Sequence, residues 1–227
     1  MERYTELFRF SYSYFYNNGP LIIENAVIQK DSVDNQILAQ IKLKNISNST
    51  VVGCKVLIFA YEINGNSLIK IISHTYLDYY IKCGEVFGDR VPIFLPSNAR
   101  RIGVEIEEVY FLDNTIWKKD TELIEIPKQS LLNQYFADKT LVDEYRIASG
   151  VDAIFVPIEW KSLFLCSCGN KNMIGTNCSK CNCSFEELSN YLNKDYLFAL
   201  RSQRRELEKR KHEEELVTRK QKKEIPY

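Results

Sequence analysis

The chain has 227 residues, with 30 basic and 30 acidic side chains, 45% hydrophobic residues, 14 Tyr, 12 Phe and only 9 Gly and 6 Pro. This composition argues against a disordered chain and favours a globular protein rich in β-strands, with room for one medium-sized domain and appendages. No apolar run follows a basic amino end, and no eighteen consecutive residues are apolar, so we expect a cytoplasmic protein without membrane insertion.

Residues from Leu21 to about Trp117 follow period-two patterns, in short runs separated by turn residues. This arrangement predicts the strands of a β-sandwich. In the run 36–44, four apolar residues predict a buried face, and they are Ile37, Ala39, Ile41 and Leu43. The residues that alternate with them, the last of which is Lys44, predict a mostly solvated face. The run 51–63 is apolar on both parities, so we expect a central strand covered on both faces, one of them by elements from outside the sandwich.

Turn residues and changes of parity divide the rest of this region. The Asn-Gly pair at 64–65 predicts a hairpin with a return strand at 68–76. The segment 86–95 predicts a further strand, which its internal proline places at a sheet edge or a bulge. The inward-facing parity changes at 107–108, and this change predicts a β-bulge.

Four segments of this region carry a family resemblance, and they are IKLKNIS, VLIFAYEINGN, FGDRVPIFLP and VYFLDNTIW. They resemble a family of immunoglobulin-like modules found in small bacterial proteins. The resemblance implies an immunoglobulin-like β-sandwich over residues 1–126. The chain has Asp113-Asn114 where the family has Asp-Gly before the terminal Trp, and Asn tolerates the same turn. The resemblance implies no function, because this fold serves many unrelated roles.

The segment 127–155 is predicted to be a helical connector. Its first apolar residues lie at helical spacing and are Leu131, Leu132, Tyr135 and Phe136. Asp138 is placed to cap a second helix, whose apolar stripe ends at Gly150; the stripe consists of Leu141, Val142 and Tyr145. We expect these helices to cover the second face of the sandwich.

Five of the seven cysteines lie within residues 166–183. In a reducing compartment, a dense cluster with an odd number of cysteines favours metal binding over disulfides. A structural zinc ion needs four ligands, which two tight turns can supply in pairs. The two turns are Cys166-Ser-Cys168-Gly169 and Cys178-Ser-Lys-Cys181-Asn182. Gly169 and Asn182 can adopt the left-handed conformation that directs backbone N–H groups toward the sulfurs.

The pattern W-x5-C-x-C-x9-C-x2-C resembles the zinc-ribbon superfamily, in a version common in small bacterial proteins. The resemblance implies a zinc ribbon over residues 156–184 that holds one structural Zn²⁺ per chain. The ligand role carries over to Cys166, Cys168, Cys178 and Cys181. The first turn departs from the usual pattern, since one residue separates its cysteines where two are common.

Three alternatives for the cysteines stay open. Cys183 could replace Cys181 as a ligand. The cysteines could form redox pairs or disulfides, or they could hold a catalytic metal. The catalytic alternative is the weakest, because catalytic zinc keeps an open position beside a general base, and His74 and His212 both lie far away in sequence.

Residues 185–227 are predicted to form one charged helix. Ser184 and Glu187 form a capping box at its start, and apolar residues continue on one face to about Leu200. Residues 201–224 carry 10 basic and 6 acidic side chains. The whole chain is similarly divided, with a net charge of −5 over residues 1–160 and +5 over 161–227. Such a division fits a basic arm for an acidic partner, or two modules that attract each other.

The sequence therefore predicts a mainly β fold with α appendages, in which an immunoglobulin-like sandwich is followed by a zinc ribbon and a C-terminal helix. It carries no phosphate-binding glycine loop and no nucleophile motif, and Glu105, Glu107 and Glu108 are interpreted as a solvated face. We expect a non-enzymatic zinc-binding adaptor or scaffold that mediates protein–protein contacts. The alternative is a nucleic-acid-binding zinc-ribbon protein that uses the basic residues of 201–224.

Overall fold

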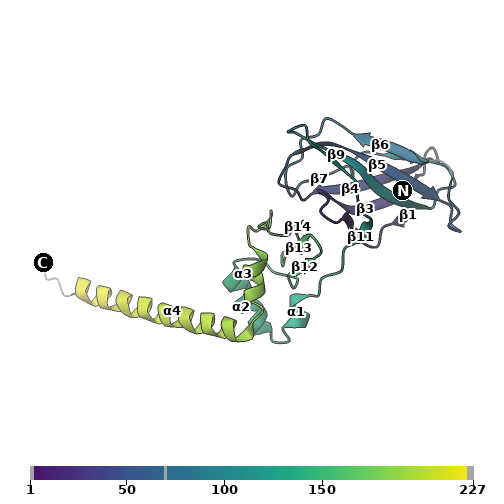
Figure 1. The fold of residues 1–227 in the computed structure, drawn as a ribbon. Helices are drawn as coiled ribbons and strands as arrows, with labels where there is room; N and C mark the ends of the chain where they lie inside the picture. The colour runs from purple at the N-terminus through teal and green to yellow at the C-terminus, as the bar shows by residue number, and fades with distance from the viewer. Residues whose placement is uncertain (1–2, 69–70, 224–227) are drawn as a thin grey trace.

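The computed structural model describes residues 3–68 and 71–223 of the chain. The described residues as far as Glu125 form strands and no helix. The strands are β1 (Tyr4–Arg9), β2 (Tyr14–Tyr16), β3 (Leu21–Asp31), β4 (Ile37–Asn45), β5 (Val51–Tyr61), β6 (Ile72–Tyr76), β7 (Val86–Phe87), β8 (Ile93–Leu95), β9 (Arg101–Phe111), β10 (Ile116–Lys118) and β11 (Leu123–Glu125). We call this part the two-sheet region. The fold is mainly β with helices that follow the sheets, as the sequence predicts (Figure 1).

Two antiparallel sheets make up the two-sheet region. One has the order β11-β2-β3-β4-β7, with β1 also paired to β3 and β8 to β4. The other has the order β10-β9-β5-β6. A continuous apolar core contains inward-facing residues of both sheets, so the two sheets pack against each other. The predicted buried face of β4 is confirmed, since Ile37, Ala39, Ile41 and Leu43 all belong to this core.

Two local predictions for this region are confirmed. Lys55 of β5 faces Glu108 of β9, whereas the next residue, Val56, faces Ile106. Glu107 is therefore the extra residue of a β-bulge, and the bulge explains the change of parity in the sequence. In the turn between β9 and β10, Asn114 has φ 65°, a conformation that Asn adopts more easily than most residues.

The prediction of one strand over 86–95 is wrong. Gly88 has φ 86°, and a Cβ atom there would lie 2.5 Å from the carbonyl oxygen of Ile41. The chain therefore bends away at Gly88 and returns, so that two short strands, β7 and β8, pair with different parts of β4. The hairpin after β5 is present, with Gly65 at φ 89°. Its return strand β6 starts at Ile72, and residues 69–70 of the predicted strand lie outside the described residues.

The prediction that helices cover the second face of β5 is also wrong. The inward-facing residues from Cys54 to Ala60 are buried, but Leu57, Phe59 and Tyr61 on the other face are only half-buried. The two helices of the predicted connector, α1 (Leu132–Tyr135) and α2 (Lys139–Ser149), pack around the cysteines instead. The apolar residues of these helices pack against the core around the cysteines. The outer face of β5, which carries Phe59 and Tyr61, therefore stays partly exposed and is called the partly open aromatic face.

The segment after β11 forms what we call the cysteine region, from α1 to α3 (Phe185–Asn190). It contains a small antiparallel sheet of β12 (Ile158–Trp160), β13 (Leu163–Leu165) and β14 (Lys171–Met173). The predicted ends of α2 are confirmed, since the Asp138 side chain accepts a hydrogen bond from the Thr140 N–H group and Gly150 has φ 65°. The core around the cysteines includes the α2 residues Leu141, Val142 and Tyr145.

A third apolar cluster joins the two regions. It brings Phe15 of β2 and Ile22 of β3 against Leu163 and Leu165 of β13, and all four side chains are at most 1% exposed. The small sheet therefore lies against the outer face of the seven-stranded sheet (Figure 1). A polar contact adds to this interface, since the backbone N–H group of Asn18 donates to the hydroxyl oxygen of Ser162 at 2.8 Å.

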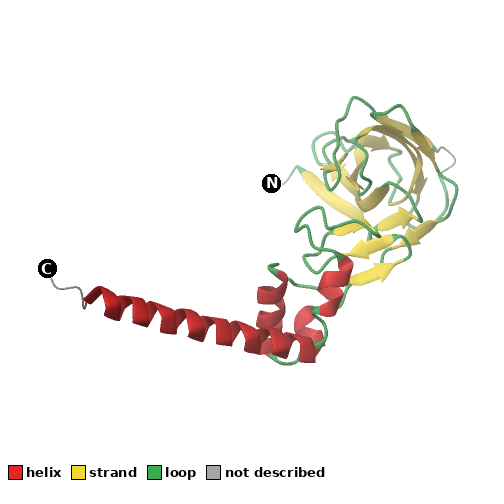
Figure 2. Cartoon of the chain, turned by 60° about the vertical axis from the view of Figure 1, so that its left-hand side comes forward, coloured by secondary structure: helices red, strands yellow, loops and turns green. Residues whose placement is uncertain are grey.

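The C-terminal segment is two helices, so the prediction of one helix is wrong. The Ser184–Glu187 capping box is confirmed, but α3 ends at Asn190 and α4 (Lys194–Lys223) begins after a turn. The Asn193 side chain causes this break, because its oxygen accepts hydrogen bonds from the N–H groups of Asp195 and Tyr196. Beyond its first turns α4 leaves the body of the molecule (Figures 1 and 2). No helix in the described part of the chain has both the length and the hydropathy of a membrane span.

Candidate metal centre

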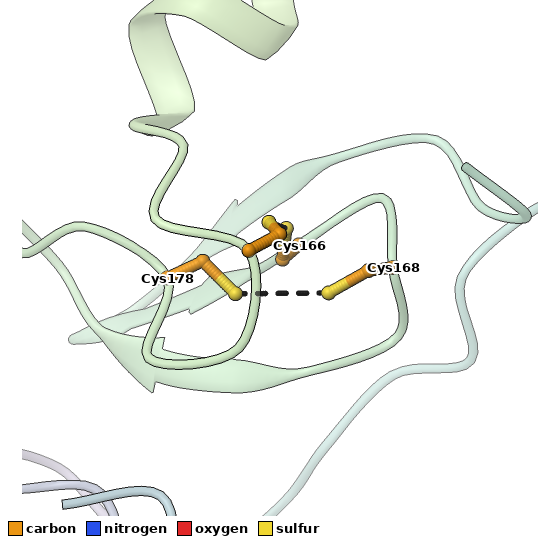
Figure 3. Close-up of side chains that lie close together, drawn as sticks. Cys166, Cys168 and Cys178 are labelled. Carbon is orange, nitrogen blue, oxygen red and sulfur yellow. Dashed lines mark hydrogen bonds between the residues drawn. The ribbon is translucent and has the colours of Figure 1, made fainter. Parts of the chain in front are cut away.

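The four cysteines selected from the sequence lie together. The sulfur atoms of Cys166, Cys168, Cys178 and Cys181 are all within 4.8 Å of one another. The sulfur–sulfur distance is 3.4 Å for Cys166 and Cys181. It is 3.6 Å for Cys168 and Cys178, the pair joined by the dashed line in Figure 3. All four are free thiols, since a disulfide would need a sulfur–sulfur distance of about 2.05 Å.

Two turns present the thiols from opposite sides. The first turn follows β13 directly, and the N–H group of Gly169, which has φ 83°, donates to the carbonyl oxygen of Cys166 at 2.9 Å. In the second turn Asn182 has φ 63°, and its N–H group donates to the carbonyl oxygen of Cys178 at 2.8 Å. Both left-handed residues therefore stand where the sequence places them. The short strand β14 connects the turns and pairs with β13.

Hydrogen-bond donors surround the sulfur of Cys178. The N–H group of Lys180 lies 3.4 Å away and the side-chain amide of Asn170 lies 3.5 Å away. Contacts with the thiols of Cys166 and Cys168 lower the pKa of Cys178, whereas contacts with Cys168 and Cys178 raise the pKa of Cys166. Four thiolates this close would repel one another, and a bound cation would favour the ionised form of all four.

The fifth cysteine of the cluster, Cys183, lies outside the group of four. Its sulfur lies 3.7 Å from the carbonyl oxygens of Ser149 and Cys181, and its thiol can donate to either one. Its backbone carbonyl accepts a hydrogen bond from the N–H group of Cys178 at 2.9 Å. Cys183 therefore contributes backbone and packing contacts, and the geometry favours Cys181 over Cys183 as the fourth ligand.

Lys44, which the sequence places on a solvated face, is buried beside the metal centre. It is 5% exposed, and its ammonium group donates to the side-chain oxygen of Asn170. Burial lowers the pKa of Lys44, while Glu24 acts in the opposite direction. No local sequence pattern indicates this contact, because Lys44 belongs to β4 of the two-sheet region and the cysteine region covers it only in the folded chain.

A polar network continues from Asn170 into the second turn. Its amide group donates to Asn172 and to the hydroxyl oxygen of Ser179, each at 2.8 Å. Asn172 is 3% exposed and accepts from the N–H group of Ser179 at 3.0 Å. This network connects Lys44 of β4 to both cysteine turns and holds the two turns together.

The four sulfurs fit a tetrahedral metal ion. Bonds of about 2.3 Å from zinc to sulfur in a tetrahedron place the sulfurs about 3.8 Å apart. Two of the observed distances, 3.4 and 3.6 Å, are slightly shorter than this value, and all of them are within 4.8 Å. Small movements of the side chains would produce the tetrahedron, so the cluster could hold one metal ion.

The other candidate residues lie apart from the cluster. His74 is on β6, with its ring centroid 4.6 Å from that of Tyr76. His212 is on the exposed part of α4. The three glutamates of β9 form ion pairs with lysines, and the pairs are Glu105–Lys119, Glu107–Lys55 and Glu108–Lys118. Among the described residues, the four cysteines are therefore the group arranged to bind a metal.

Comparisons with protein-family models, with curated proteins and with solved structures give no significant match to the chain. The functional inference therefore depends on the geometry of the cysteine cluster and of the surfaces around it.

Proposed function

We propose that Cys166, Cys168, Cys178 and Cys181 bind one structural Zn²⁺, and that the chain serves as a non-enzymatic adaptor. The observation that carries this proposal is the closed set of four thiols within 4.8 Å of one another. Four protein ligands complete a tetrahedron, so no position is left for a water molecule or a substrate. Sites of this kind hold small folds together.

We also propose that the cysteine region is a zinc ribbon and that the two-sheet region is an immunoglobulin-like sandwich. The first assignment is supported by the two facing cysteine turns and the short antiparallel strands that carry them. The second is supported by two antiparallel sheets with a shared apolar core. Residues 1–126, 127–155, 156–184 and 185–227 would then be the sandwich, the connector, the ribbon and the C-terminal segment.

The adaptor role is supported by what the surfaces of the molecule offer. The protruding part of α4 and the partly open aromatic face of β5 are surfaces that a protein partner could cover. The alternative is nucleic-acid binding through the basic residues of 201–224. It is less favoured because Arg201 and Arg204 both form ion pairs with Glu144 of α2 and are therefore less available to phosphate groups. We therefore favour a protein partner.

Metal analysis of freshly purified protein tests the zinc site. We expect one zinc ion per chain, its loss in Cys181→Ser and its retention in Cys183→Ser. The opposite result for these two matched variants would mean that Cys183 is the fourth ligand. Zinc absent from all preparations, including protein produced with added zinc, would refute the site.

Affinity capture from the native cell tests the adaptor role, with the intact chain and a 1–200 truncation compared with and without nuclease. A protein partner that resists nuclease supports the adaptor. Loss of every partner after nuclease treatment, together with salt-sensitive binding of nucleic acid by the intact chain only, would support the alternative.

A further inference from the structure

A groove follows the outer edge of β9 in the two-sheet region. Two adjoining hollows of about 470 and 880 Å³ share Phe8, Tyr61 and Ile102 as lining residues. The wall opposite β9 is aromatic, because the segment from β1 to β2 places Phe8, Phe10 and Tyr14 there. These rings pack against the core behind them, so the wall is a fixed part of the fold.

Among the described residues, no strand is paired with the β9 edge that lies in this groove. On one side β9 pairs with β5 from Arg101 to Phe111, and on the other side β10 pairs only with residues 108–110. No described strand pairs with the outer edge of residues 101–105. In an antiparallel strand, alternate residues direct their N–H and C=O groups away from the neighbouring strand. The groove therefore contains backbone groups able to pair with an added strand.

Two charged side chains of this edge, with a glycine between them, give the groove a polarity. Arg101, Gly103 and Glu105 lie on the same face of β9, beside Tyr61, Phe59 and Leu57 of β5. Gly103 leaves the rings next to it uncovered, and a Cβ atom at this position would meet Phe59 and Tyr61 at an ordinary 3.7 Å. A basic end, an apolar centre and an acidic end thus follow one another at the two-residue period of a strand.

Glu125 of β11 strengthens the acidic end of the groove, since it lines the same hollow as Glu105. Among the described residues no cation forms an ion pair with Glu125, whereas Glu105 pairs with Lys119 at 2.6 Å. Both members of that pair are about one-third exposed, and exposed pairs contribute little to stability. An incoming basic side chain could therefore share these carboxylates at small cost.

We propose that this groove binds an extended peptide segment of a partner protein, added as an antiparallel strand to β9. The peptide would place a basic residue opposite Glu105, a large apolar residue over Gly103 and an acidic residue opposite Arg101. In chain order this is basic–x–apolar–x–acidic, because all pairs in this sheet are antiparallel. The proposal rests on the adaptor function and names the partner's chemistry. A small apolar molecule would leave the backbone groups of β9 unpaired, so a strand fits better.

Selection from a phage-displayed library of random linear 12-residue peptides on the full zinc-loaded chain tests the proposal. We expect the enriched peptides to share the basic–x–apolar–x–acidic pattern. Gly103→Phe, which fills the apolar centre, should weaken their binding more than tenfold. Ser73→Phe is the matched control, because it adds the same ring to the opposite edge of the same sheet, and it should leave binding within twofold. A lack of enrichment, or equal binding by Gly103→Phe, would overturn the proposal.

A charge-exchanged variant tests the orientation without filling the groove. In Arg101→Glu/Glu105→Arg we expect the selected peptides to show the reverse order, acidic–x–apolar–x–basic. An unchanged order would overturn the proposed register. Failure of the groove can be distinguished from failure of the adaptor function: a captured protein partner that binds Gly103→Phe and the unaltered chain equally well would remove the groove and leave the adaptor.

Discussion

The two-sheet region and the cysteine region keep their folds by different means. The first buries a continuous apolar core between two sheets, with many aliphatic side chains from β3, β4, β5 and β9. The second has a smaller core in which two of the buried residues, Cys166 and Cys178, are candidate metal ligands. The stabilisation from the hydrophobic effect is roughly proportional to the apolar area that folding buries. A small region buries less apolar area, so a bound metal ion would contribute a larger share of its stability. The comparison predicts that metal removal and core mutations affect the two regions unequally.

The largest effect is expected from Cys178→Ser. This change removes a side chain that belongs to both the candidate metal centre and the core, so we expect the cysteine region to lose metal binding and its folded structure. The amides of β5 and β9 should stay protected from hydrogen exchange, which can be followed by mass spectrometry. If protection of both regions is lost together, the two are one cooperative unit and the comparison fails.

Phe15→Ala should have the next largest effect, because Phe15 is fully buried in the cluster that joins the two regions. Loss of a buried Phe side chain costs about 3–5 kcal/mol. We expect the urea-unfolding transitions of the two regions to move further apart than in the unaltered chain, followed by the fluorescence of Trp117 on β10 and Trp160 on β12. Phe94→Ala is the matched control on the same sheet; Phe94 is 62% exposed, and this variant should unfold as the unaltered chain does.

A smaller effect is expected from Lys44→Met. The substitution removes the buried ammonium group that donates to Asn170 and leaves the Asn170 oxygen without this partner, at a cost of about 1–3 kcal/mol. We expect zinc to be transferred faster to a chelator, because the Asn170 network that positions the turns becomes looser. Lys42→Met is the control, since Lys42 lies on the same strand and is half-exposed. Equal transfer rates for the two variants would argue against a role for Lys44.

The smallest effect is expected from Ser184→Ala, which removes the N-cap of α3. The expected loss is about 1 kcal/mol, confined to the cysteine region, with zinc content unchanged. Thermal unfolding of this region, followed by circular dichroism, measures it. Ser202→Ala in α4 alters a hydroxyl that is not a cap, and a similar loss in that variant would contradict the capping interpretation.

Features determined by neighbouring residues could be predicted from the sequence. The bulge at Glu107, the caps at Asp138 and Ser184 and the approach of the four cysteines all follow from short patterns. Features that depend on distant parts of the chain could not be predicted. The bend at Gly88 is tied to Ile41, and the cover over Lys44 comes from a segment more than one hundred residues away.

The difference between local and distant determinants also explains why the prediction for the outer face of β5 is wrong. Leu57, Phe59 and Tyr61 make β5 apolar on both parities, and this pattern predicts a cover. The apolar pattern of β5 predicts burial of both faces but does not indicate whether the residues that bury them belong to the same molecule. The connector helices find a closer apolar partner around the cysteines, so the outer face of β5 is available to another chain.

The length of α4 has a consequence for the dimensions of the molecule in solution. Thirty helical residues extend about 45 Å, and most of this length lies away from the body (Figure 2). A compact chain of this size would have a radius of gyration of about 17 Å. Small-angle X-ray scattering should give a larger radius and a distance distribution with a long tail. A molecule bound at the far end of the helix would therefore lie several nanometres from the four cysteines.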